Sequence, residues 1–171
     1  MDFFEKLGAL GLGSRLKRLS DIYLSDVRRL YQESGIEFEP KWFPVFVLLL
    51  ERKQITITEV AELLNLTHPH VSLYAKEMIR AKLAHFVDNP GDGRSRLLTL
   101  TQKGRATARQ LQPLWIRIDK AVKEILKETD PDFLFTLKKM ETALVRTSLR
   151  QRVLKNNRSS KSKSFVEVTP T

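Results

Sequence analysis

The sequence predicts a mainly α-helical fold with one small β-hairpin, in which long terminal helices flank a pair of short helices and the hairpin. Three observations predict this fold. Apolar residues recur every three or four positions near both ends of the chain, two short helical patterns lie close together in its middle, and an alternating apolar pattern follows them. One domain with appendages is expected, because 171 residues can bury one sizeable core but are short for two.

The first long helix is expected from Ser14, which is a good N-cap, to about Gly35. Its apolar stripe consists of Leu16, Leu19, Tyr23, Val27 and Leu30. A second helix is expected over residues 41–52. It is apolar on most sides and therefore belongs in a core, with Pro44 tolerable only in its first turn.

The segment "TITEVAELLNLTHPHVSLYAKEMIRAKL" predicts two short helices joined by a sharp turn. Thr56 and Glu59 have the spacing of a capping box, and Asn65 stands where a left-handed residue usually ends a helix. Thr67 is expected to cap the second helix, over residues 67–80. The outward positions of that helix are His68, His70, Ser72, Leu73 and Lys76.

The next segment predicts a two-stranded hairpin over residues 86–101, with "NPGDG" as its turn. Gly91 and Gly93 are expected to let the backbone turn. Asp92 is expected to hold the side chain of Arg94 through a charge-assisted hydrogen bond. The hairpin then carries two arginines at its tip, Arg94 and Arg96.

A second long helix is expected from Lys103, with a kink at Pro113. The sequence Asp130-Pro131-Asp132 is expected to cap a last helix, whose apolar stripe is Phe133, Leu137, Met140 and Leu144. The basic, Ser-rich segment over residues 156–171 is expected to be a disordered tail.

Composition excludes several kinds of site. The chain has 30 Lys and Arg against 20 Asp and Glu, a net charge of +10, which favours polyanionic partners such as nucleic acid. It has no cysteine, and the spacing of His68 and His70 places them on different helix faces, so neither a metal nor another cofactor is expected. No nucleophile-base pair or phosphate-binding glycine loop predicts an enzyme. No run is long enough to span a bilayer, and a cytoplasmic, nucleoid-associated protein is expected.

Two helices in a tight turn followed by a hairpin are typical of a winged helix-turn-helix, whose second helix enters the major groove of duplex DNA. The hairpin, or wing, would place Arg94 in the minor groove, where the negative potential attracts a guanidinium. The predicted DNA contacts are Thr67, His68, His70, Ser72, Leu73, Lys76, Asp92, Gly93, Arg94, Ser95 and Arg96.

The helix pair and the wing segment "DGRSRLLTLTQKG" resemble the MarR family of bacterial transcriptional regulators, over about Ser14 to Glu128. The resemblance implies a homodimer built from the terminal helices and, in many members, release of DNA by an aromatic acid or related compound. The family often has glycine where this chain has Lys82. The predicted dimerisation residues are Leu16, Leu19, Tyr23, Val27, Phe133, Leu137, Met140 and Leu144.

The predicted domains are an N-terminal dimerisation helix (1–35), a winged helix-turn-helix (36–102), C-terminal dimerisation helices (103–155) and the tail (156–171). The predicted function is a homodimeric, sequence-specific transcriptional regulator on a palindromic operator, with half-sites roughly 34 to 36 Å apart. Two alternatives stay open: the regulatory half, or a relative, of a regulator fused to a GNAT-type acetyltransferase, and a nonspecific architectural DNA-binding protein. A basic membrane-surface protein is disfavoured, because no lysine-rich helix face carries aromatic residues. The operator, the effector and its pocket, and repression versus activation are left open.

Overall fold

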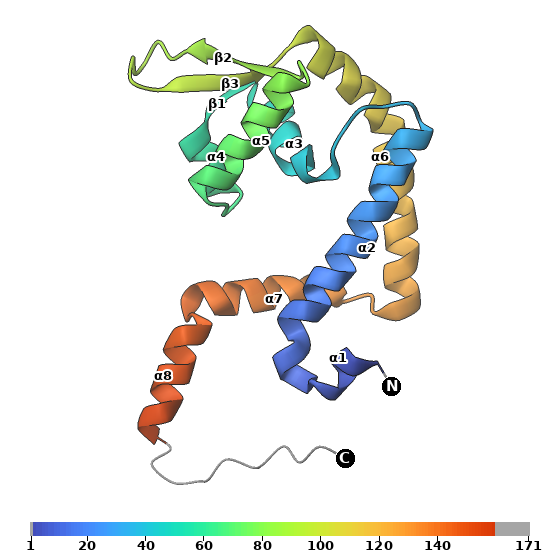
Figure 1. Ribbon diagram of the computed structural model, residues 1–171, viewed down its shortest axis with the longest axis vertical. Coiled ribbons are helices and arrows are strands. Elements are labelled where there is room, and N and C mark those ends of the chain that lie inside the picture. The colour runs from blue at the N-terminus through green and yellow to red at the C-terminus, as the bar shows by residue number, and fades with distance from the viewer. Residues whose placement is uncertain (1, 160–171) are drawn as a thin grey trace. The chain divides into compact units, whose positions relative to one another are not determined.

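The computed structural model describes residues 2–159 of the chain, and it divides into two compact units at Ile118, within one long helix. The elements, labelled in Figure 1, are α1 (Phe3–Lys6), η1 (Gly8–Gly11), α2 (Leu12–Glu33), η2 (Pro40–Trp42), α3 (Phe43–Arg52), β1 (Gln54–Thr56), α4 (Ile57–Leu63), α5 (His68–Arg80), β2 (Ala84–Asp88), β3 (Arg96–Leu100), α6 (Gln102–Thr129), α7 (Phe133–Arg146) and α8 (Leu149–Ser159). The mainly α-helical fold with a small wing is confirmed.

The core of the first unit forms around α3, as its apolar composition predicts. Val45, Phe46 and Leu49 of this helix are buried, and Pro44 lies in its first turn. The helix begins at Phe43 rather than Lys41, because the preceding residues form the separate 3-10 turn η2. Proline is well tolerated at both starts, since its missing N–H would have no partner inside the helix there.

The sheet has three antiparallel strands in the order β1-β3-β2, so the prediction of a two-stranded hairpin was incomplete. The short strand β1 pairs with β3, with Gln54 opposite Thr99. This makes β3 the central strand and explains why Thr99 is buried although it alternates with the apolar Leu98 and Leu100. Its hydroxyl donates to the backbone oxygen of Lys53 at 2.8 Å, which satisfies the buried polar group.

Aromatic side chains join the C-terminal half of α2 to this core. Phe38 contacts the rings of Tyr31, Trp42, Phe46 and Trp115 edge to face. The indole N–H of Trp115 donates to the Tyr31 hydroxyl at 3.1 Å, and burial raises the pKa of Tyr31. The last part of α2 therefore packs into the core of the first unit.

The start of α2 differs from the prediction. The helix begins at Leu12 with Gly11 at the N-cap position, so Ser14 lies inside the first turn and is not the cap. Two elements that the sequence analysis missed, α1 and η1, precede it. Asp2 and Glu5 form a reciprocal capping box at α1, and Arg18 of α2 forms an ion pair with Asp2 at 2.5 Å.

The second unit begins at Asp119 and contains the end of α6, then α7 and α8. Asp132 occupies the N-cap position of α7, but its side chain makes no capping bond. Its N–H instead donates to the Asp130 carboxylate at 3.0 Å. The sequence analysis missed α8, which continues to Ser159, and the remainder of the predicted tail lies outside the described residues.

Candidate nucleic-acid interface

The helix-turn-helix is formed by α4 and α5, and local signals set its turn. Thr56 and Glu59 make the predicted capping box at α4: the Thr56 hydroxyl accepts from the Glu59 N–H, and the Glu59 carboxylate accepts from the Thr56 N–H. The Glu59 carboxylate accepts from both the N–H and the hydroxyl of Thr56, and these two hydrogen bonds lower the pKa of Glu59. Asn65 ends the first helix with a φ of 50°, as predicted, and the N–H of Leu66 donates back to the Ala61 carbonyl.

α5 begins where it was predicted to begin, but the Thr67 side chain does not make the predicted capping contact. Thr67 is at the N-cap and Pro69 is in the first turn. The Thr67 side chain makes no capping bond to the backbone. Its hydroxyl lies 3.0 Å from Nδ1 of His70 instead, so this threonine orients an imidazole.

One face of α5 is buried and the opposite face is open. Val71, Ala75 and Met78 point into the core, which fixes the helix against α4 and the sheet. The predicted outward residues are exposed, except that Ser72 is half-buried; they are His68, His70, Ser72, Leu73 and Lys76. The face thus carries small polar and cationic groups around Leu73, whose side chain is 48% exposed.

Each histidine of this face has one ring nitrogen next to a hydroxyl. Ser72 Oγ lies 3.3 Å from Nδ1 of His68, and Thr67 Oγ1 lies beside Nδ1 of His70 in the same way, although there the hydroxyl precedes the histidine in the chain. If the hydroxyl donates, the neutral imidazole carries its proton on Nε2. Among the described residues Nε2 has no hydrogen-bond partner in either ring. It is then a donor suited to guanine O6 or N7, or to a phosphate.

The wing is ordered by two side chains that cap its own turn. Asn89 accepts from the N–H of Gly91 at 3.0 Å and donates to the Ser95 hydroxyl at 2.8 Å. Asp92 accepts from the backbone N–H of Arg94 at 3.0 Å. The expected bond from Asp92 to the guanidinium of Arg94 is absent from the described structure, because the carboxylate is used in the turn itself.

The glycines of the wing also differ from the prediction. Neither Gly91 nor Gly93 has a positive φ, and a Cβ at Gly93 would meet nothing within 4 Å. The turn is therefore made by the asparagine and aspartate side chains rather than by glycine. Gly93 leaves the backbone beside Arg94 uncovered, which suits close approach to another molecule.

The two wing arginines are both exposed but are held differently. The Arg96 guanidinium lies over the Phe86 ring, 5.1 Å from its centroid, across the β2–β3 pair. Arg94 has only its backbone fixed, so its side chain is free to follow a partner. Figure 1 shows the β2–β3 turn extending beyond the sheet, away from α6.

Just after the C-terminal end of α5, this chain has a lysine where the MarR family often has a glycine. Lys82 adopts a φ of 62° there, and the N–H of Leu83 donates to the Met78 carbonyl at 2.9 Å. The Thr101 hydroxyl in turn donates to the Lys82 carbonyl at 2.7 Å. These bonds hold lysine in a left-handed conformation that costs a non-glycine residue about 1 to 2 kcal/mol.

The predicted dimerisation residues fall into two groups. In the first unit, Leu16, Leu19 and Tyr23 are exposed on α2, but Val27 is buried in the core of its own chain. In the second unit, Phe133, Leu137 and Met140 of α7 are half-buried and Leu144 is 48% exposed. Further exposed apolar residues lie outside the predicted set: Leu10, Ile22, Leu134, Phe135, Val145, Leu149 and Val153.

Two negative findings apply to the part of the chain that the structure describes. No group of three or more metal-ligating side chains comes together in it. None of its helices is both long enough and apolar enough to cross a membrane.

Several solved structures are similar to this chain. A transcriptional repressor, CouR, bound to a 23-mer DNA duplex is 27% identical, with 80% of this chain and 96% of that chain covered and a TM-score of 0.63. A mutant of MarR from E. coli in complex with operator DNA is 22% identical, covers 84% of this chain and 99% of that one, and has a TM-score of 0.60. BpsR from Bordetella bronchiseptica, described with regulation of its DNA binding by 6-hydroxynicotinic acid, is 20% identical, covers 76% and 98%, and has a TM-score of 0.59.

No protein-family model and no curated protein matches the chain. The structural similarity nevertheless extends over nearly the whole length of those solved structures. The chain is therefore a MarR-like winged-helix protein.

Proposed function

We propose that the protein is a homodimeric, sequence-specific transcriptional regulator that binds double-stranded DNA with α5 in the major groove and the β2–β3 wing in the minor groove. One observation carries the proposal: the exposed face of α5 and the exposed arginines of the wing belong to one compact unit. The two structures of similar fold that are described as bound to DNA support it. The proposal assigns no catalytic step and no cofactor to the chain.

In this proposal the face of α5 reads base edges. The imidazole Nε2–H groups of His68 and His70 would donate to purine acceptors, and Leu73 would contact a thymine methyl group. Lys76 has the length and charge to reach a phosphate. A lost base contact is expected to change sequence preference by about 1 to 3 kcal/mol, whereas a lost phosphate contact weakens binding on every sequence.

The wing would act through charge and shape rather than through a base code. Arg94, with only its backbone fixed, would enter the narrow minor groove, and Arg96 on the Phe86 ring would face the phosphates. Asp92 would serve both arginines indirectly, by ordering the turn that carries them. Thr67, Gly93 and Ser95 would contribute small groups that let the backbone approach the duplex.

The dimer is proposed from apolar side chains that the chain leaves exposed. The first unit exposes Leu16, Leu19 and Ile22 along α2, and the second exposes Leu134 and Val145 on α7. Exposed apolar rows of this length are expected to be covered by a second copy. A two-fold dimer predicts a palindromic site with half-sites roughly 34 to 36 Å apart.

The proposal includes a small-molecule effector bound beside α2. A surface hollow of about 500 Å³ lies beside α2 and η2, and its lining includes Arg28, Phe38, Glu39 and Trp42. An aromatic acid could lie in this hollow and pair with Arg28 in place of Glu39. The described regulation of BpsR by 6-hydroxynicotinic acid supports this chemistry. Such a ligand would shift DNA binding by a coupling of about 1 to 3 kcal/mol, measurable by thermal shift with and without operator.

The decisive experiment is selection of bound duplexes from a random pool, followed by titration at two salt concentrations. We expect a two-fold symmetric consensus, and an affinity that falls about 10³- to 10⁵-fold between 50 and 200 mM salt if six to ten phosphates are neutralised. Binding without any consensus would favour the nonspecific architectural protein, which the net charge of +10 also suits. Absence of duplex binding would reject the proposal.

A further inference from the structure

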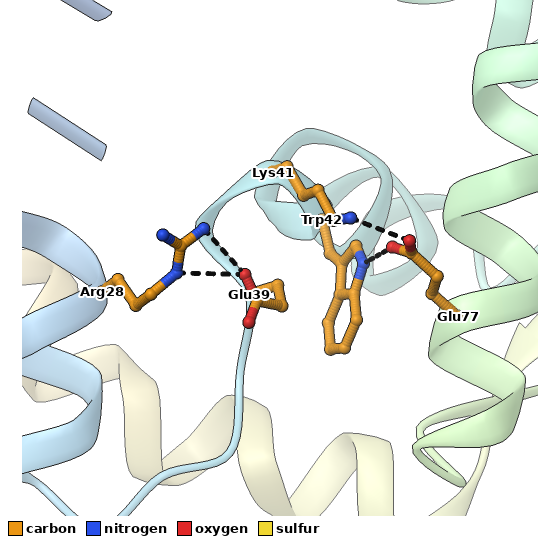
Figure 2. Close-up of polar contacts among 5 residues, drawn as sticks. All are labelled: Arg28, Glu39, Lys41, Trp42 and Glu77. Carbon is orange, nitrogen blue, oxygen red and sulfur yellow. Dashed lines mark hydrogen bonds and ion pairs between the residues drawn. The ribbon is translucent and has the colours of Figure 1, made fainter. Parts of the chain in front are cut away.

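The short turn η2 lies between α2 and α5 and is held on both sides by charged contacts (Figure 2). On the α2 side, Arg28 donates through Nε and a terminal nitrogen to one oxygen of Glu39, at 3.2 and 3.0 Å. On the α5 side, Lys41 Nζ donates to Glu77 at 2.8 Å and the indole N–H of Trp42 donates to it at 2.7 Å. One turn of chain therefore connects the proposed dimer helix to the proposed recognition helix.

The contact at Glu77 is more specific than an ordinary surface ion pair. Each carboxylate oxygen has its own donor, and one donor is the indole of a Trp42 side chain that is buried in the core. These two hydrogen bonds lower the pKa of Glu77, so the carboxylate stays ionised at neutral pH. A bidentate arrangement fixes direction as well as distance, which a single exposed ion pair does not.

Lys41 also reaches the proposed base-reading residues. Its ammonium lies over the Tyr74 ring, 5.8 Å from the centroid, and the Tyr74 ring stacks with His70 at 6.5 Å and an interplanar angle of 27°. His70 in turn contacts the Thr67 hydroxyl. A strip of contacts thus runs along one side of α5 from Glu77 to His70, and Lys41 touches it at two points.

We propose that Lys41 is a positioning residue for sequence recognition: by bonding Glu77 and lying over Tyr74, it sets the orientation of the His70 imidazole presented to the major groove. The inference rests on the proposed function, but it concerns a residue outside both the helix-turn-helix and the wing. Lys41 contributes orientation rather than affinity in itself. Its loss therefore changes discrimination between sequences more than binding to all of them.

The first test compares variants on the selected duplex and on a random duplex. Lys41→Ala is expected to lower the ratio of the two affinities about 2- to 30-fold, the range found for residues that act on a site without touching its ligand. Lys17→Ala is the matched control, because it removes the same charge from an exposed ion pair with Asp21 on α2. Its ratio should stay at the wild-type value. Lys41→Arg, which keeps the charge and the ring contact, should restore the ratio.

The same titrations separate positioning from a direct phosphate contact. If Lys41 bound a phosphate, Lys41→Ala would weaken both duplexes equally and would lower the slope of log affinity against log salt by about one. That result would overturn the inference while leaving the proposed function intact. A double-mutant cycle of Lys41→Ala with Glu77→Gln should show non-additive effects on the ratio, since each variant breaks the same contact.

A measurement on the free protein makes the test independent of DNA. The ring signals of His70 and Tyr74 in NMR spectra should shift in Lys41→Ala and stay in place in Lys17→Ala. Unchanged His70 signals in Lys41→Ala would overturn the inference whatever the DNA results. Failure of wild-type protein to bind any duplex, with the His70 shift present, would reject the proposed function but leave the positioning contact established.

Discussion

Replacement of Gly104 by alanine tests how closely α6 is packed against the exit of the recognition helix. A Cβ at this position would lie 2.1 Å from the carbonyl oxygen of Leu83 and 3.1 Å from its carbonyl carbon. The neighbour is backbone, and the same oxygen accepts from the N–H of Thr101 at 3.0 Å. The steric clash of the new methyl group can therefore be relieved only if the start of α6 moves away from the segment that follows α5.

The size of the effect follows from this geometry. Overpacking of a well-packed site costs about 1 to 3 kcal/mol. The added methyl group also strains two hydrogen bonds. The Thr101 N–H donates to the Leu83 carbonyl, and the Gly104 N–H donates to the Thr101 hydroxyl at 2.9 Å. Each of these bonds is worth about 1 kcal/mol. Alanine regains about 0.5 to 1 kcal/mol in a helix relative to glycine. The net expectation is a loss of about 2 to 4 kcal/mol in the free energy of unfolding.

Urea unfolding followed by tryptophan fluorescence measures this loss, because both tryptophans, Trp42 and Trp115, belong to the first unit. Gly13→Ala is the matched control: it lies in α2, and its Cβ would meet nothing within 4 Å. We expect the control to be unchanged or stabilised by up to about 1 kcal/mol. A Gly104→Ala midpoint at or above that of the wild type would refute the argument from close approach.

Three further outcomes are expected. Lys82→Gly should raise the free energy of unfolding by about 0.5 to 1 kcal/mol in the same assay, since glycine adopts a φ of 62° without the strain of lysine. A loss of stability would show that the Lys82 side chain matters more than its backbone conformation. The pKa of Glu59 is lowered below its usual 4.5. The ionised carboxylate therefore adds to the free energy of unfolding above that pH, and this stabilisation is lost as the pH falls through the lowered pKa. Glu59→Gln should accordingly flatten the pH dependence of the urea midpoint below about pH 4.5. The same pH dependence as in the wild type over that range would contradict this. Arg94→Ala should weaken binding to selected and random duplexes alike and reduce the salt slope by about one, whereas loss on the selected duplex alone would argue for a base contact.

The sequence was sufficient where a feature depends on neighbours a few residues apart. The capping box of Thr56 and Glu59, the left-handed Asn65 and the start of α5 at Thr67 were all predicted and confirmed. The exposed face of α5 followed from helical spacing alone. These features need only the backbone geometry of one helix end or one helix.

Predictions failed where a side chain had several possible partners nearby. The Thr67 hydroxyl contacts His70 rather than the helix backbone, and Asp92 accepts from the Arg94 N–H rather than from its guanidinium. Both polar groups were placed correctly, but the competing partner was closer in the folded turn. Spacing along the chain does not rank such partners, because threonine and aspartate side chains can bond to several neighbouring backbone and side-chain groups.

What the sequence by itself determined is the order of the long helices, the helix-turn-helix with its wing, and most of the outward residues on α5, because these depend on periodicity and on local hydrogen bonds. What only the tertiary structure decided is the third strand β1, the contacts of Lys41 and Trp42 with Glu77, and the close approach of Gly104 to Leu83. Each of these joins segments that are well separated in the chain. Which of these segments meet depends on how the whole core packs. Sequence motifs of one to three residues do not specify that packing.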